Sequence, residues 1–112
     1  MIKLAIVDDK YQNRHSLAEK IVYSNEVEIV FTAVNGKDFL DKMKTSSGKS
    51  RPEVVLMDIE MPEMDGIQAV YNGNILYPEV KFIMLTVFDD DDKLFEAIKA
   101  GASGYFLKDE KI

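Results

Sequence analysis

The 112-residue sequence contains no cysteine, so it can form neither a disulfide framework nor a thiolate site. It also lacks an excess of positive charge: 14 basic residues against 20 acidic ones give a net charge of −6, which disfavours nucleic-acid binding. No apolar run approaches transmembrane length, and Met1-Ile2-Lys3 leads into a strand rather than into the apolar region of a signal peptide. We therefore expect a cytoplasmic domain that neither crosses a membrane nor binds nucleic acid through these residues.

What remains is the composition of an ordinary globular domain. The sequence is 46% hydrophobic and 30% charged, without repeats, low-complexity tracts or internal linkers. A chain of this length is near the usual size of a single domain and long enough to bury a core. We therefore expect residues 1–112 to form one domain.

Short apolar runs alternate with helical stripes along the chain. Strands are expected at residues 2–7, 27–33, 53–58, 80–86 and 104–107, with a helix in each of the four intervals. This alternation with short connections predicts a parallel sheet with right-handed crossovers. The last two strands are apolar at odd and even positions, so both of their faces need cover. The segment 109–112 is typical of the first turn of a fifth helix, so we expect the sequence to stop within that helix.

Helix boundaries follow from capping residues and helix breakers. The first helix is expected to begin at Asn13 or a neighbour as cap, and the second at Asn35, with Asp38 at the third helical position. The third is expected to begin near Ile67. It is predicted to be weak because Asn72-Gly73-Asn74 lies in its middle, where glycine costs about 1 kcal/mol relative to alanine.

Four of the predicted strands lead directly into a chemically useful side chain. These side chains are Asp8 and Asp9, then Asp58, Thr86 and Lys108. The carboxyl ends of parallel strands meet at one edge of the sheet, where open α/β folds bind ligands. Three acids, a hydroxyl and an amine that converge there can hold a hard cation and a phosphoryl group.

These residues resemble a known family over essentially the whole chain: the receiver domain of two-component response regulators. The resemblance is carried by Ile6–Asp9, Leu56–Gly66, Ile83–Thr86 and Gly101–Lys108. The stretch Leu85–Asp91 and the pair Lys108-Asp109 are most similar to the NarL/FixJ-type branch, whose members usually continue into a helix-turn-helix DNA-binding domain. DNA binding and control of transcription are therefore expected of a longer parent protein and not of residues 1–112.

The resemblance implies a flavodoxin-like α/β fold. Its five-stranded parallel sheet is doubly wound, has the order 2-1-3-4-5, and here lacks the last helix. An uncovered apolar face is an association site. We therefore also expect self-association of residues 1–112, by pairing of bare faces or by exchange of elements.

The mechanism implied by the resemblance centres on Asp58. This residue would accept a phosphoryl group from a phosphohistidine on a sensor histidine kinase, so the domain is a phosphoacceptor switch that catalyses only its own phosphorylation and dephosphorylation. Crowded carboxylates favour a divalent cation with oxygen ligands, Mg²⁺ or alternatively Mn²⁺. We expect Asp9, Asp58 and the carbonyl of Glu60 to bind it directly, and Asp8 to act largely through water.

Three further residues are expected to respond to the phosphoryl group. The ammonium of Lys108 and the hydroxyl of Thr86 would each contact a phosphoryl oxygen. Tyr105 matches the switch aromatic of the family, which turns inward as the threonine moves, although it is also compatible with an ordinary core residue. Glu60 and Val87 lie where the family tunes the lifetime of the phosphoryl group.

Two other classes of function compete with this reading. A Mg²⁺-dependent phosphohydrolase of the haloacid dehalogenase type needs Asp-x-Asp at the end of its first strand, whereas this strand ends in Asp8-Asp9-Lys10. A phosphorylation-independent interaction module generally loses an acid or the lysine, and all of them are present here. The sequence therefore favours the phosphoacceptor switch.

Overall fold

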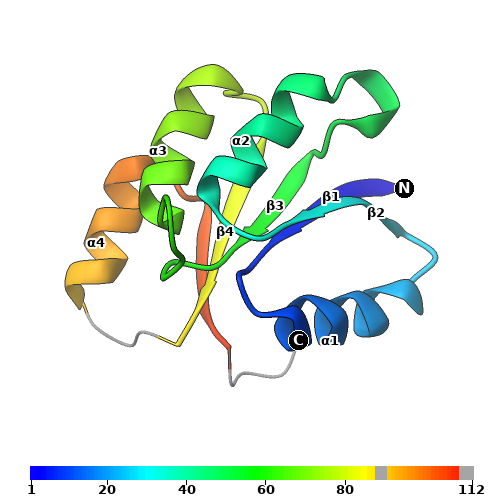
Figure 1. Ribbon diagram of the computed structural model, residues 1–112, viewed down its shortest axis with the longest axis horizontal. Coiled ribbons are helices and arrows are strands. Elements are labelled where there is room, and N and C mark those ends of the chain that lie inside the picture. The colour runs from blue at the N-terminus through cyan, green and yellow to red at the C-terminus, as the bar shows by residue number, and fades with distance from the viewer. Residues whose placement is uncertain (88–90, 109–112) are drawn as a thin grey trace.

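The computed structural model describes residues 1–87 and 91–108 as a five-stranded sheet flanked by helices (Figure 1). The elements in chain order are β1 (Ile2–Val7), α1 (Tyr11–Val22), β2 (Val27–Ala33), α2 (Gly36–Thr45), the short 3₁₀ helix η1 (Gly48–Ser50), β3 (Val54–Met57), α3 (Gly66–Leu76), β4 (Lys81–Thr86), α4 (Asp91–Ala100) and β5 (Gly104–Leu107). The strands are parallel, and their order is β2-β1-β3-β4-β5. This confirms the predicted doubly wound sheet.

Two hydrophobic cores lie on opposite faces of the sheet. The larger one is covered by α2, α3 and α4, and at its centre the rings of Phe39 and Phe82 meet edge to face at 5.8 Å. The smaller one lies under α1, where Leu17 packs with Leu4, Ile6 and Leu85. Burying one such side chain contributes about 1.5–3 kcal/mol, so the two layers hold the sheet from both sides.

The first helix begins earlier than predicted. Tyr11 is its first residue and Lys10 its N-cap, without a capping side chain, so the assignment of Asn13 as cap was wrong. The physical reason is that the Lys10 amide donates instead to Asp8 Oδ1 at 2.9 Å. Asn13 therefore lies within the first turn. The second helix starts as predicted, since the Asp38 amide donates to Asn35 Oδ1 at 2.8 Å.

The third helix runs without interruption through the segment expected to weaken it. It is capped by Asp65, whose side chain accepts from the Gln68 amide at 2.9 Å. Gly73 is buried, and a Cβ atom there would lie 2.7 Å from the tip of the Phe82 ring. Glycine is therefore required by close packing of α3 on β4, and this packing offsets its poor helix propensity.

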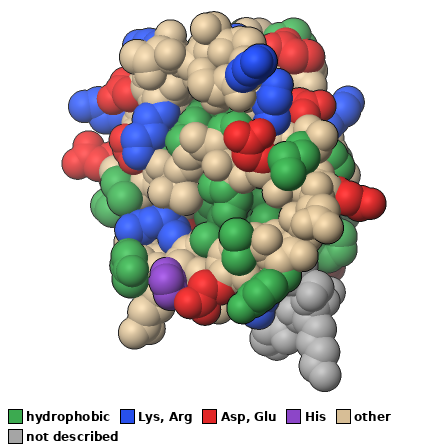
Figure 2. All heavy atoms as spheres, turned by 90° about the vertical axis from the view of Figure 1, so that its right-hand side faces the viewer, with side chains coloured by type: hydrophobic (Ala, Val, Ile, Leu, Met, Phe, Trp, Pro, Cys, Tyr) green, Lys and Arg blue, Asp and Glu red, His purple; other side chains and the backbone are tan. Residues whose placement is uncertain are grey.

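The remaining boundaries bear on the site and on the surface. Strand β3 ends at Met57, which leaves Asp58 just beyond it, and the expected helical turn at 109–112 lies outside the described residues. No helix among the described residues combines the length and the apolar character that crossing a bilayer demands. Figure 2 shows one face on which acidic and basic side chains are interspersed around hydrophobic ones, so that face presents no continuous basic surface for nucleic acid.

Candidate functional site

The ends of two neighbouring strands bring three carboxylates together. Strands β1 and β3 pair in parallel with Val7 opposite Met57, so the next residues, Asp8 and Asp58, emerge side by side. The Asp58 amide donates to the Val7 carbonyl at 2.9 Å and extends this register. Carboxylate oxygens of Asp8, Asp9 and Asp58 all lie within 4.8 Å of one another. The predicted convergence at the carboxyl edge is therefore present.

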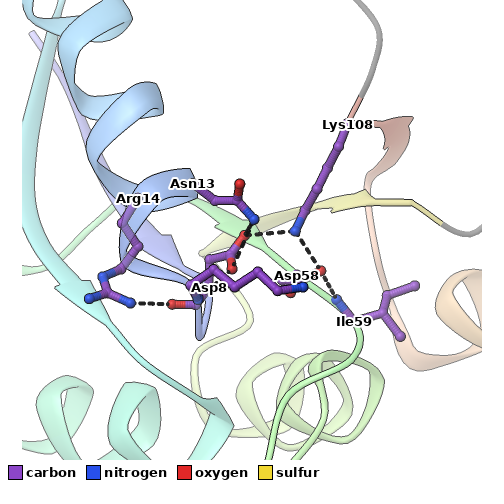
Figure 3. Close-up of polar contacts among 7 residues, drawn as sticks. Asp8, Asn13, Arg14, Asp58, Ile59 and Lys108 are labelled. Atoms are coloured by element: carbon purple, nitrogen blue, oxygen red, sulfur yellow. Dashed lines mark hydrogen bonds and ion pairs between the residues drawn. The ribbon is translucent and has the colours of Figure 1, made fainter.

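Asp8 is buried and surrounded by hydrogen-bond donors (Figure 3). Lys108 Nζ lies 2.8 Å from Oδ2, and the Lys10 amide donates to Oδ1. The Asn13 side-chain amide lies 3.3 Å from Oδ2 and 3.5 Å from Oδ1. Arg14 Nη1 donates to the main-chain carbonyl of Asp8 at 2.8 Å, which fixes the turn between β1 and α1. Asp8 thus has its charge balanced by the protein itself.

Asp9 differs from its neighbour. Its Oδ1 atom is buried and has no hydrogen-bond partner among the described residues. An uncompensated buried carboxylate oxygen is costly unless a cation or a donor approaches it. Because the other two carboxylates lie within 4.8 Å, a divalent cation with oxygen ligands fits here. Asp9 offers it a free oxygen, whereas Asp8 does not.

Asp58 is the described carboxyl group whose proton affinity the fold changes most. Its Oδ1 accepts from the Ile59 amide at 2.9 Å and lies 3.2 Å from Lys108 Nζ. Burial, followed by the negative charge of Asp8, raises the pKa of Asp58 from 3.8 to about 6, against the opposing effect of Lys108. The carboxylate is therefore ionised at neutral pH, although burial and the charge of Asp8 destabilise its charged form. A cation or an electrophile beside it would relieve this destabilisation.

Lys108 joins the strand end of β5 to the acids of β1 and β3. Burial alone would lower the pKa of its ammonium, but the hydrogen bond to Asp8 and the charges of Asp58 and Asp8 raise that pKa above 10.5. Lys108 is therefore a cation throughout the physiological range. It contacts two carboxylates at once, at 2.8 and 3.2 Å, so it is positioned to meet an anion that arrives between them.

The other predicted residues surround these groups. Thr86 is fully buried at the end of β4. Tyr105 pairs with Met84 in the sheet and packs against the larger core, so its ring lies on the α2–α4 side. Glu60 and Val87 are exposed and line an open hollow of about 930 Å³ together with Asp9, Asp58 and Lys108. This hollow leaves the acids accessible from outside the protein.

Glycine permits the close approach that places Asp58. The Gly66 amide donates to the Ile59 carbonyl at 2.7 Å and draws the start of α3 against the end of β3. A Cβ atom on Gly66 would lie 1.9 Å from the Asp58 carbonyl oxygen. The loop between β3 and α3 can therefore take this path only with glycine at that position.

Two contributors to the site were missed by sequence reasoning. Asn13 was interpreted as a cap and Arg14 was not considered, yet both donate to Asp8. A signal was available in their spacing: residues three and four positions after Lys10 share one face of a helix with it. Because β1 leads straight into α1, that face is the one turned toward the acids.

The raised pKa of Asp58 predicts how stability depends on pH. The folded protein holds this proton up to about pH 6, and the unfolded chain loses it near 3.8. The metal-free protein is therefore expected to lose stability as pH rises from about 4 to 6, by roughly 3 kcal/mol for this group. Asp58→Asn removes this effect. In EDTA, the Tm of the variant relative to that of the parent should therefore rise between pH 4 and pH 7, as measured by thermal unfolding. A difference between variant and parent that is constant over this range would contradict the assignment.

Comparison with known proteins gives consistent matches. Residues 4–112 match the response regulator receiver domain family. The transcriptional regulatory protein LnrK of Bacillus subtilis is 39% identical over 109 residues, which are 97% of this chain and 48% of LnrK. The chain thus spans about half the length of the curated relatives it matches.

Solved structures agree with these matches. A DNA-binding response regulator of the LuxR family from Staphylococcus aureus superposes with a TM-score of 0.88 at 25% identity, over 99% of this chain and 89% of that one. CheY in the CheX-CheY-BeF3-Mg complex from Borrelia burgdorferi gives a TM-score of 0.87 at 25% identity, over 98% of this chain and 80% of that one.

Proposed function

The chain belongs to the response regulator receiver domain family, and we propose that it is the phosphoacceptor switch of a cytoplasmic two-component system, with Asp58 as the phosphorylated residue. One observation carries the proposal: Asp8, Asp9 and Asp58 lie within 4.8 Å of one another, and Lys108 contacts two of them. Carboxylates crowded in this way suit a divalent cation, and the adjacent ammonium suits a phosphoryl oxygen.

In the proposed reaction, a carboxylate oxygen of Asp58 attacks the phosphorus atom of a phosphohistidine on a sensor histidine kinase. A phosphorus–oxygen bond forms as the phosphorus–nitrogen bond breaks, and the leaving imidazole keeps the electron pair. Phosphoryl transfer depends mainly on positioning and on neutralisation of charge. Lys108 supplies a positive charge 3.2 Å from the attacking group, and Arg14 and the Lys10 amide hold the turn beside it.

The residues that would hold the metal are Asp9 and Asp58 directly, with the Glu60 carbonyl, and Asp8 through water. When bound, Mg²⁺ or Mn²⁺ supplies positive charge for the phosphoryl oxygens. The contrast between the two neighbouring acids supports this division: Asp9 Oδ1 is buried and unpaired among the described residues, whereas Asp8 has donors on both oxygens.

The acyl phosphate would then redistribute the contacts of the site. Lys108 and the buried Thr86 hydroxyl would turn to the phosphoryl oxygens, and Tyr105, already packed against the core, would follow Thr86. A DNA-binding domain that controls transcription would receive the change in a longer protein. The relatives support this reading, because LnrK is a transcriptional regulatory protein about twice as long as the matched segment.

The function is tested by incubation with acetyl phosphate. The protein is expected to gain one phosphoryl group, seen as an increase in intact mass, when Mg²⁺ is present and not when EDTA is present. Omitting the metal in this way separates phosphorylation at the acidic site from nonspecific acylation. An equal mass gain in EDTA would contradict the proposed chemistry.

Asp9→Ala is expected to abolish most of the stabilisation that Mg²⁺ gives to the protein, because Asp9 supplies the free oxygen. Thermal unfolding in EDTA and in Mg²⁺ measures this stabilisation. Glu60→Ala is the matched control, since it keeps the main-chain carbonyl that would bind the metal. If the increase in Tm caused by Mg²⁺ is the same in Asp9→Ala as in the parent, Asp9 is not a ligand.

A further inference from the structure

We propose that Asn13 is a positioning residue of the phosphoacceptor site: its side-chain amide retains the Asp8 carboxylate when Lys108 leaves it for the phosphoryl group. The inference rests on the proposed function and adds a residue to it. Asn13 lies in the first turn of α1 and lines the open hollow beside Lys108 and Asp58.

Asn13 and Lys108 share one oxygen atom. Lys108 Nζ is 2.8 Å from Asp8 Oδ2, and Asn13 Nδ2 is 3.3 Å from the same atom. Figure 3 shows both side chains pointing toward Asp8, one from α1 and the other from the end of β5. A donor–acceptor distance of 3.3 Å is longer than the usual 2.9–3.0 Å of an N–H···O bond. The Asn13 contact is therefore weak while Lys108 occupies the shared oxygen.

The environment of Asp8 makes this second donor important. Its side chain is only 3% exposed, so bulk solvent reaches this carboxylate poorly. The Lys10 amide donates to Asp8 Oδ1 at 2.9 Å. Among the described residues, Oδ2 accepts from Lys108 and Asn13 alone. When Lys108 turns to a phosphoryl oxygen, Asn13 is the side-chain donor that remains for Oδ2 within the described part of the protein.

A buried acceptor left without its donor costs more than a well-made hydrogen bond contributes. By closing on the vacated oxygen, Asn13 lowers the free energy of moving Lys108 from Asp8 to the phosphoryl group. Without Asn13, Lys108 stays more firmly bound to Asp8. The amide therefore favours the phosphorylated state over the unphosphorylated one, although it contacts no reacting atom.

Beryllofluoride, a mimic of the phosphoryl group, provides the first test. Its affinity is measured by titration calorimetry at saturating Mg²⁺ for the parent, Asn13→Ala, Lys108→Met and the double variant. Asn13→Ala is expected to weaken binding about three- to tenfold, the effect of one hydrogen bond. In the Lys108→Met background the same change should alter affinity by less than about twofold, because Asp8 then has the same partners in both states. Gln12→Ala, at an exposed position in the same turn, is the control.

Thermal unfolding of the four metal-free proteins provides a second test that needs no ligand. Removal of Asn13 is expected to lower Tm more in the Lys108→Met background than in the parent, because Asn13 is then the last side-chain donor to Asp8. An equal or smaller effect there overturns the inference, and so does an equal loss of beryllofluoride affinity in both backgrounds. A parent protein that fails to bind beryllofluoride refutes the proposed function itself, which the unfolding experiment does not depend on.

Discussion

Asp58→Asn is expected to abolish Mg²⁺-dependent phosphorylation by acetyl phosphate. An amide lacks the negative charge and the nucleophilic oxygen of a carboxylate, so no acyl phosphate can form at this position. Intact mass after a fixed incubation measures the loss. Burial and Asp8 raise the pKa of the Asp58 carboxyl group to about 6, so its charged form destabilises the metal-free fold at neutral pH. The variant lacks this charge and should remain folded, so loss of labelling cannot be attributed to unfolding.

The matched control for this substitution is Asp41→Asn. Asp41 is an exposed acid of α2 and takes no part in the site, so this variant should be labelled like the parent. Mg²⁺-dependent labelling of Asp58→Asn at the parental rate would show that another residue accepts the phosphoryl group.

Gly66→Ala is expected to destabilise the protein strongly, because the added methyl group has no space in the loop between β3 and α3. The new Cβ would lie 1.9 Å from the Asp58 carbonyl oxygen and 2.8 Å from its carbonyl carbon. Both are main-chain atoms, so no side-chain rotation can relieve the clash, and the loop or the strand end must move. Overpacking of this kind costs about 3 kcal/mol or more. A lower Tm and slower phosphorylation should therefore appear together, because the displaced atoms carry Asp58.

Gly104→Ala separates this clash from the general effect of replacing glycine. A Cβ atom at Gly104 would meet its nearest neighbour, the Phe106 ring, at 3.5 Å, an ordinary contact. This variant should change Tm by little and should be phosphorylated normally. Similar behaviour of the two variants would contradict the view that Gly66 is required by the close approach of α3 to β3.

Much of the fold could be predicted from local pattern. The β-branched run of Val27–Ala33 gave the second strand with its observed bounds, and Asn35 with Asp38 gave the start of α2. These features depend on residues near one another in the sequence. The role of Gly73 in α3 was missed for the opposite reason, because the constraint on Gly73 comes from the ring of Phe82, nine positions away and on another element.

The site shows the same division between local and distant causes. The strand ends were enough to predict that Asp8, Asp58 and Lys108 meet, since parallel strands share a carboxyl edge. The arrangement of donors was not predicted, because it depends on which face α1 turns to the sheet, and the spacing of residues 10, 13 and 14 that indicates this face was not used. Capping preference favoured Asn13 as a helix start. Instead, Asp8 accepts the amide of the N-cap Lys10, and Asn13 lies in the first turn with its side chain directed at the carboxylate.

Borohydride reduction of the phosphorylated protein tests the central claim most directly. An acyl phosphate on aspartate is reduced to the side chain of homoserine, which marks the modified residue permanently, and peptide mass spectrometry then locates it. The expected result, after acetyl phosphate and Mg²⁺, is conversion at Asp58 and at no other acid. Conversion at Asp8 or Asp9, or phosphorylated protein with no reducible aspartate, would contradict the assignment of Asp58 as the phosphoacceptor.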